Sequence, residues 1–109
     1  MKTLVIHAPK SAVNRGSRSF QDTFSKQVGD EYGIFSSLFA QIKPGCPVIL
    51  LSNPERQQAE GRLVKLTPRT ITRGVQRYDV EITKPKMVTY RGDQPPLKRC
   101  LNRWGVAVI

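Results

Sequence analysis

IKPGCPVILLSNPERQQAEGRLVKL, residues 42–66, places two different strand patterns on either side of one turn. PVILL, residues 47–51, is apolar without interruption, which is typical of a strand covered on both faces. AEGRLVKLT, residues 59–67, carries charges between its apolar residues, which favours a strand with one face in water. SNPER between them is a turn cluster, and Gly61 indicates a bulge or a close approach of two backbones.

Further strand patterns flank this hairpin. Residues 3–8 are rich in β-branched residues, and residues 75–83 alternate between apolar and charged side chains. Lys84-Pro85 is expected to end that strand, and residues 86–90 are expected to form the next one. The apolar segment 105–109 predicts a sixth strand, which we expect to pair with the first.

Helical patterns occupy the remaining segments. Ser19, with Asp22 three residues later, fits a helix start, and Gly29 is expected to end that helix. Residues 33–42 predict a second helix that plugs the core, because its apolar residues fall on one face: Ile34, Phe35, Leu38, Phe39 and Ile42. A third helix is predicted after Pro96, with an apolar face formed by Leu97, Cys100, Leu101 and Trp104.

These elements predict one domain over residues 1–109, a size at which a chain needs neither metal nor disulfides to fold. Because the predicted strands are mostly consecutive, we expect an α+β, β-rich fold. Its centre would be a small antiparallel β-barrel of about five or six strands, with two or three short helices at its ends. In such a barrel, strands covered on both faces are apolar throughout, whereas strands with one face in solvent alternate apolar and polar residues.

The charge balance indicates an anionic partner. The chain has 18 Lys and Arg against 8 Asp and Glu, a formal charge of +10, and a pI near 10.2. A domain with a pI above about 9 has the electrostatic footprint of a nucleic-acid-binding protein. The same charge would also serve solubility or an acidic protein partner. The sequence has no apolar run long enough for a signal peptide or a membrane span, so we expect a soluble, cytoplasmic protein.

Catalytic and metal-binding residues are scarce. Cys46 and Cys100 lack the spacing of a zinc site and are expected to be buried thiols, and no cofactor is predicted. His7 is expected to be a structural histidine within the first strand, although an enzymatic role stays open. The carboxylates Asp30, Glu31, Asp79 and Glu81 lie among basic residues and are expected to form local charge pairs.

The order of these elements resembles the PUA-like superfamily, which includes the PUA, ASCH, EVE and YTH domains. The resemblance is carried by IKPGCPVILL, which is similar to the family's glycine turn before a hydrophobic barrel strand, and by the AEGRLVKL and RYDVEIT strands that follow. It implies a small barrel and an association with RNA or DNA. Two positions depart from the family pattern: Cys46 stands where many relatives have Asp, and Trp104 is the only tryptophan for a base-binding aromatic pocket. Phe20, Phe24, Phe35 and Phe39 are expected in the helical core.

Three basic clusters are candidate nucleic-acid contacts. Arginines in a Ser/Asn/Gly loop before a helix can hold a phosphate, although such a loop can also be simply solvated; this first cluster comprises Lys10, Asn14, Arg15, Ser17 and Arg18. The second, in and after a strand turn, comprises Arg69, Arg73 and Arg77; because their spacing does not require one surface, a solvated face explains it slightly better. The third lies on the polar face of the last predicted helix, which suits a phosphate backbone but also suits water, and comprises Lys98, Arg99 and Arg103. Tyr90, next to Arg91, is a candidate for base stacking, whereas Tyr78 is expected to face the core.

The sequence therefore favours a module that binds nucleic acid through this basic surface, with a pocket near the first loop. RNA or a single strand is preferred to duplex DNA, because no predicted helix is long and basic enough to read a major groove. Two alternatives stay open: a small endoribonuclease of toxin type, and an adaptor for an acidic protein. No membrane partner is predicted.

Overall fold

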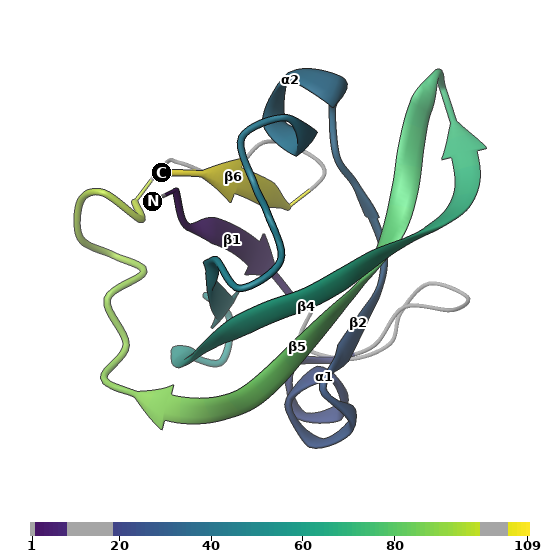
Figure 1. Ribbon diagram of the computed structural model, residues 1–109. Helices are drawn as coiled ribbons and strands as arrows, with labels where there is room; N and C mark the ends of the chain where they lie inside the picture. Colours follow the sequence, from purple (N-terminus) through teal and green to yellow (C-terminus); the bar gives the residue numbers. More distant parts are fainter. Residues whose placement is uncertain (1, 9–18, 99–104) are drawn as a thin grey trace.

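The computed structural model describes residues 2–8, 19–98 and 105–109. Six strands and two short helices follow each other along the chain: β1 (Leu4–His7), α1 (Phe20–Lys26), β2 (Val28–Gly33), α2 (Ser36–Phe39), β3 (Pro47–Ser52), β4 (Gln57–Thr72), β5 (Val75–Val88) and β6 (Val106–Val108). Figure 1 shows a strongly curled sheet with α2 and α1 at its opposite ends. The predicted β-rich fold with short helices at its ends is therefore confirmed.

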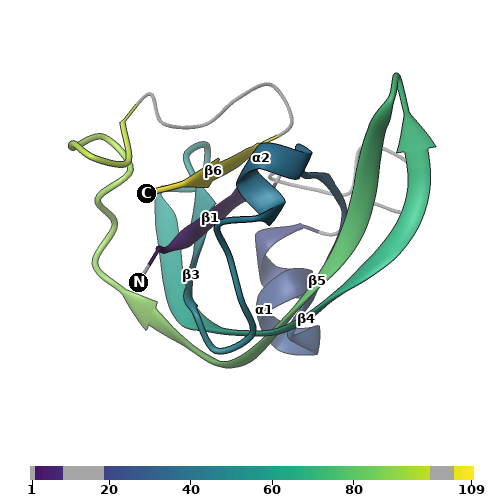
Figure 2. The same ribbon diagram turned by 45° about the horizontal axis from the view of Figure 1, so that its top comes forward.

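The strands form one curled sheet, a half-barrel, in the order β2-β5-β4-β3-β1-β6. The long β4 and β5 cross the whole molecule and carry most of the curvature (Figure 2). Neighbouring strands are antiparallel, with one exception that the sequence interpretation did not include: β1 and β3 are parallel. A parallel pair requires a crossover connection, and the segment containing α1, β2 and α2 supplies it.

The two faces of the sheet explain why PVILL is apolar throughout. Val48 and Leu50 point into the main core, together with Ile6 of β1. Ile49 points the other way and packs against a smaller cluster that contains Val5 and others on the opposite face. The prediction of a strand covered on both sides is therefore confirmed. The final strand also pairs antiparallel with β1, as predicted.

Helix α1 begins as the sequence predicts, because the Ser19 hydroxyl accepts a hydrogen bond from the backbone N–H of Asp22. It ends earlier than expected: Gln27 takes a left-handed conformation, and β2 starts at the next residue. The sequence interpretation missed β2 because two glycines and an Asp-Glu pair resemble a turn. This strand pairs with β5 through a bulge in which Glu31 has φ 51°.

The prediction that residues 33–42 form a helix plugging the core is wrong. Only one helical turn, α2, forms, because the backbone of Phe35 is still extended and Ile34 donates its N–H to the carbonyl of Gln76. Ile34 and Ile42 are buried on either side of the turn, whereas Phe35 and Phe39 are 40% and 42% exposed. Phe35 and Phe39 therefore lie at the surface and not in the core.

The second half of the predicted barrel is a single long hairpin. The expected break at Lys84-Pro85 is wrong: β5 continues through both residues, with Lys84 at φ 51°. The ladder accommodates them with a bulge beside Gly61, where an added Cβ would lie 3.0 Å from the carbonyl oxygen of Thr83. The predicted bulge and close approach at Gly61 are thus both confirmed. The turn spans only Arg73 and Gly74, both at positive φ, as a two-residue hairpin turn favours.

The predicted helix after Pro96 lies largely outside the described residues. In the described part of the chain, no helix is long and apolar enough to cross a lipid bilayer.

Candidate nucleic-acid interface

The structure describes only part of the predicted basic surface. The first cluster and its proposed pocket lie outside the described residues: Lys10, Asn14, Arg15, Ser17 and Arg18. The same holds for Arg99 and Arg103 of the third cluster, whose Lys98 is exposed. The described candidates therefore lie on the β4–β5 hairpin and on the segment that follows it.

The three arginines of the second cluster have different environments on this hairpin. The guanidinium of Arg69 lies 3.6 Å from a carboxylate oxygen of Asp79, and Nε of Arg77 donates a 2.8 Å hydrogen bond to the carbonyl of Glu31. Arg73 is exposed in the hairpin turn. Two of the three arginines therefore help to hold the hairpin, and Arg73 is presented to solvent at its tip.

A polar network fixes the hairpin to β2. The hydroxyl of Thr70 donates a 2.7 Å hydrogen bond to the carboxylate of Glu31, and the backbone N–H of Glu31 donates to Asp79 at 3.1 Å. Asp79 thus contacts both Arg69 and the β2 bulge. Glu81 lies 3.8 Å from the ammonium group of Lys65. The local charge pairs predicted for Asp79 and Glu81 are confirmed.

The tip of the hairpin is stiffened by Gln76. Its side-chain amide donates to the carbonyls of Arg69 at 3.0 Å, Arg77 at 2.9 Å and Thr70 at 3.4 Å. Two of these carbonyls lie in the bulge where the ladder register shifts between Pro68 and Ile71. A bulge leaves backbone groups unpaired, and here one amide side chain satisfies them.

An aromatic cavity of about 250 Å³ lies between α2 and the hairpin turn. Phe39 lines it from α2, Phe35 from the position just before that helix, and Tyr78 from β5. The rings of Phe39 and Tyr78 are stacked, with centroids 5.1 Å apart and planes 22° from parallel. The backbone around Gly74 and the hydroxyl-bearing Ser36 add polar groups to the rim. Because the rings of Phe39 and Tyr78 stack on each other, one face of each is covered, and a flat ligand would have to use the remaining aromatic surface of the cavity. Tyr78 is half-buried and packs against the core, as expected, yet it also borders this cavity.

Sequence reasoning missed this aromatic site. The apolar spacing of residues 33–42 fits a buried helix face, which assigned both phenylalanines to the core. The sequence contained one signal against a long helix: Gly33 lies at the start of the segment and Pro44-Gly45 close it. The residues between them are too few for a stable helix.

Tyr90 is less free for stacking than the sequence suggested. Its hydroxyl donates a 2.6 Å hydrogen bond to the side chain of Asn53, and the guanidinium of Arg56 lies 4.7 Å from its ring centroid. Arg56 also pairs with Asp93 at 3.1 Å. One face of the Tyr90 ring is therefore covered. Arg91 is exposed, while its backbone N–H donates to the buried Gln58.

His7 fits the predicted structural role. Its Nε2 accepts a 3.1 Å hydrogen bond from the backbone N–H of Asn53, and burial lowers its pKa. The lone pair that a general base would use is engaged by the backbone, and the ring is held as the neutral tautomer protonated at Nδ1. Nearby, the hydroxyl of Tyr32 donates to the His7 carbonyl at 3.4 Å, and its pKa is raised by burial and by the charge of Asp30.

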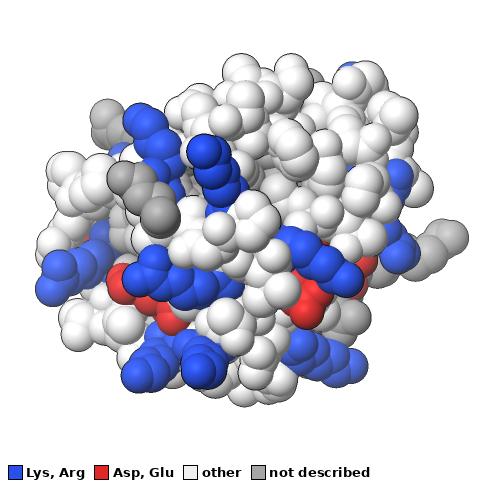
Figure 3. All heavy atoms as spheres, viewed as in Figure 1, with Lys and Arg blue, Asp and Glu red and all other residues white. Residues whose placement is uncertain are grey.

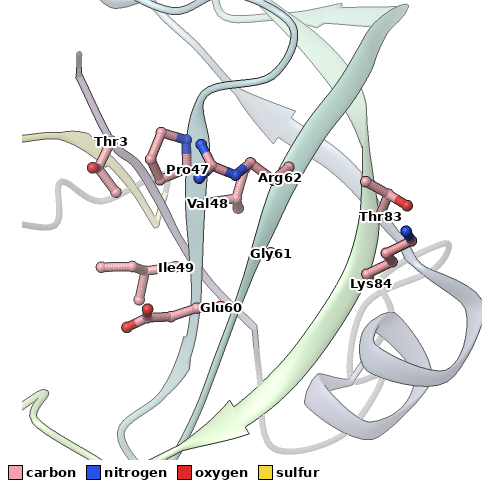
Figure 4. A pocket seen from close by; sticks show the side chains of 9 residues that line it. All are labelled: Thr3, Pro47, Val48, Ile49, Glu60, Gly61, Arg62, Thr83 and Lys84. Carbon is pink, nitrogen blue, oxygen red and sulfur yellow. The ribbon is translucent and has the colours of Figure 1, made fainter.

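A second cavity, of about 360 Å³, opens over β3, β4 and β5 (Figure 4). Its charged side chains are Glu60, Arg62 and Lys84. The guanidinium of Arg62 donates to the carbonyl of Gly45 at 3.1 Å, so this cation also supports the loop before β3. Because Glu60 shares the opening with two cations, this cavity does not select an anion as a purely basic site would.

The charge distribution alone does not mark an interface. Figure 3 shows Lys and Arg spread over one face, with Asp and Glu between them. The part of this face over α2 carries few charges, and cationic side chains border it (Figure 3). The described residues contain no group of three or more His, Cys, Asp and Glu placed to hold a metal ion. The aromatic cavity is therefore the candidate site, with the exposed Arg73 next to its lining residue Gly74.

No protein-family model matches the chain, and neither the curated proteins nor the solved structures contain a match to it.

Proposed function

We propose that this protein is a nucleic-acid-binding module of PUA-like type that holds RNA or another single strand without cleaving it. The observation that carries the proposal is the pair of exposed aromatic residues, Phe35 and Phe39, beside a hairpin tip that presents Arg73. The formal charge of +10 supports an anionic partner, and a cytoplasmic location forms part of the proposal.

Stacking distinguishes a nucleic acid from other polyanions. Every base has a π-face, and stacking a base on an aromatic side chain is worth about 1–3 kcal/mol. Heparin and acidic proteins offer charge without a comparable run of flat rings. Phe35, Phe39 and Tyr78 supply the stacking surface, and the exposed Arg73, next to Gly74 of the cavity, would neutralise a phosphate.

The geometry favours a single strand over a duplex. Helix α2 is one turn long and α1 spans seven residues, so neither can lie in a major groove and read base edges. The aromatic cavity can accept a base only if that base is unstacked and unpaired. Loops, ends and single strands of RNA present bases in this way.

The test is fluorescence anisotropy with single-stranded RNA, single-stranded DNA, duplex DNA and heparin, each at several salt concentrations. We expect the single strands to bind most tightly, with affinity that falls as salt rises. Phe39→Ala should weaken single-strand binding about fivefold to 150-fold, the range for one stacked base, with little change in heparin binding. Met87→Ala is the matched control, because Met87 is 49% exposed on the same hairpin but outside the cavity.

Three results would overturn the proposal. Equal binding of heparin and RNA, with no effect of Phe39→Ala, would indicate general polyanion binding or an acidic protein partner. Cleaved RNA on a gel after the titration would indicate an endoribonuclease. No binding to any nucleic acid would reject the proposed partner altogether.

A further inference from the structure

The end of the β4–β5 hairpin exposes a large aliphatic side chain. Ile71 is 68% exposed, the highest value among the large hydrophobic residues that the structure describes as exposed. It lies one residue from the last position of β4, where the hairpin projects beyond the rest of the sheet (Figures 1 and 2). Single exposed apolar residues are common on protein surfaces, so its position relative to the cavity decides whether it has a function.

Ile71 lies on the hairpin face that borders the aromatic cavity. In the ladder it stands opposite Gln76, and directly opposed residues in an antiparallel pair share one face. Tyr78 is two residues from Gln76 on β5 and therefore points to the same side. Gln76 and Tyr78 both line the cavity. Ile71 does not itself line the cavity, but it lies on the same hairpin face as Gln76 and Tyr78, which do.

The tip is also held rigidly. The Gln76 amide binds the carbonyls of Arg69 and Thr70 immediately before Ile71, and Thr70 is tied to Glu31 of β2. A β-branched side chain has few rotamers, so Ile71 loses little freedom when it is buried in a complex. Such a side chain is suited to enter a narrow space between two flat rings.

The charges around Ile71 fit the same ligand. Arg73 follows two residues later and is exposed, whereas Arg69, two residues earlier, is paired with Asp79. In duplex DNA, proteins that bind the minor groove insert apolar wedges such as isoleucine between base steps and unstack them; the same insertion is applied here to the stacked bases of a single strand. An acidic protein surface would satisfy the arginines but would offer Ile71 no stack to enter.

We infer that Ile71 inserts between two neighbouring bases of the bound strand and separates them, so that one of them can enter the cavity lined by Phe35, Phe39 and Tyr78. This inference rests on the proposed function and adds a mechanism to it. The wedge breaks the stack, and the aromatic rings then hold the released base.

The test uses the whole protein and a single-stranded RNA that carries one 2-aminopurine, whose fluorescence is quenched by stacking on its neighbours. Binding is followed in parallel by anisotropy. The wild-type protein should raise the 2-aminopurine fluorescence as it binds. Ile71→Ala should still bind but lose most of that rise, Ile71→Leu should keep most of it, and Met87→Ala should behave as wild type. Because Ile71 is exposed, its replacement should leave the fold intact, which circular dichroism verifies.

The outcomes separate this inference from the proposed function. Binding with an undiminished rise in Ile71→Ala, or binding of the wild type with no rise at all, would overturn the wedge and leave the binding module standing. No binding by the wild type would reject the proposed function, and the wedge with it.

Discussion

The Nε atom of Arg77 donates a 2.8 Å hydrogen bond to the backbone carbonyl of Glu31, a residue 46 positions earlier in the chain. The Glu31 carboxylate accepts a second bond from Thr70, on the other strand of the hairpin. One residue of β2 therefore contacts both β4 and β5 near the point where the hairpin leaves the sheet. Arginines counted as candidate ligands from the sequence are, in part, the supports of the proposed site.

Removal of the Glu31 carboxylate should loosen the hairpin tip. Glu31→Ala leaves the backbone bonds to Arg77 and Asp79 possible but removes the acceptor for Thr70, and we expect a loss of about 1 kcal/mol in the free energy of unfolding. Hydrogen exchange should speed up for amides near residues 70–76 and little elsewhere. Glu55→Ala, in the exposed turn after β3, is the control. Uniformly faster exchange across the sheet would contradict a local role.

The unfolding free energy should depend on pH through His7. Folding lowers the pKa of His7 because the ring is buried, so the unfolded chain binds the proton more readily. The stability that depends on neutral His7 is fully present above its ordinary pKa of 6.5 and is lost as the pH falls through the folded value. Urea unfolding between about pH 5 and 8 measures this slope. In His7→Gln the side-chain oxygen can still accept from Asn53 without titrating, so the slope should flatten; an unchanged slope would assign it to other groups.

The bulge at Gly61 should not tolerate a side chain. A Cβ there would lie 3.0 Å from the carbonyl oxygen of Thr83 and 3.3 Å from Cα of Pro85, and both neighbours are backbone atoms. We expect Gly61→Ala to lower the free energy of unfolding by about 1–3 kcal/mol, the usual cost of overpacking. Glu60→Ala, at the exposed neighbouring position, should change it far less. Equal midpoints in urea for the two variants would show that the strands can separate at no cost.

Arg73 should act as a phosphate contact. Arg73→Ala should weaken binding to all single strands by a similar factor and reduce the slope of log K against log salt by about one counterion. Lys26→Ala removes an exposed cation from the last turn of α1, away from the cavity, and should leave the slope unchanged. If both variants reduce the slope equally, the interface is not confined to the hairpin tip.

The sequence predicted elements whose pattern is decided locally. The uninterrupted apolar run 47–51, the alternation of 75–83 and the Ser19 cap all correspond to observed elements. Elements decided by a distant partner were missed. β2 has little strand character of its own and forms against β5. A proline usually interrupts a strand, but here the bulge beside Gly61 accommodates Pro85 within β5.

The candidate site was less predictable than the fold. A helical spacing of apolar residues does not reveal how many turns will form, and the single turn of α2 leaves Phe35 and Phe39 at the surface. The arginines of the hairpin were chosen as candidates because of the high net charge. The sequence could not show that Asp79 and Glu31 already bind Arg69 and Arg77. Both outcomes depend on contacts between residues far apart in the sequence.

The place of β1 between β3 and β6 has a consequence for the order of folding. Val5 pairs with Ile49 on one side and with Ala107 on the other, so one early strand depends on partners from two distant parts of the chain. Closing such long loops costs entropy before the contacts form, which slows folding. The β4–β5 hairpin, whose contacts are local, can form first. We therefore expect the hairpin, which carries Arg73 and Tyr78 of the proposed site, to be organised before the half of the sheet that completes the core.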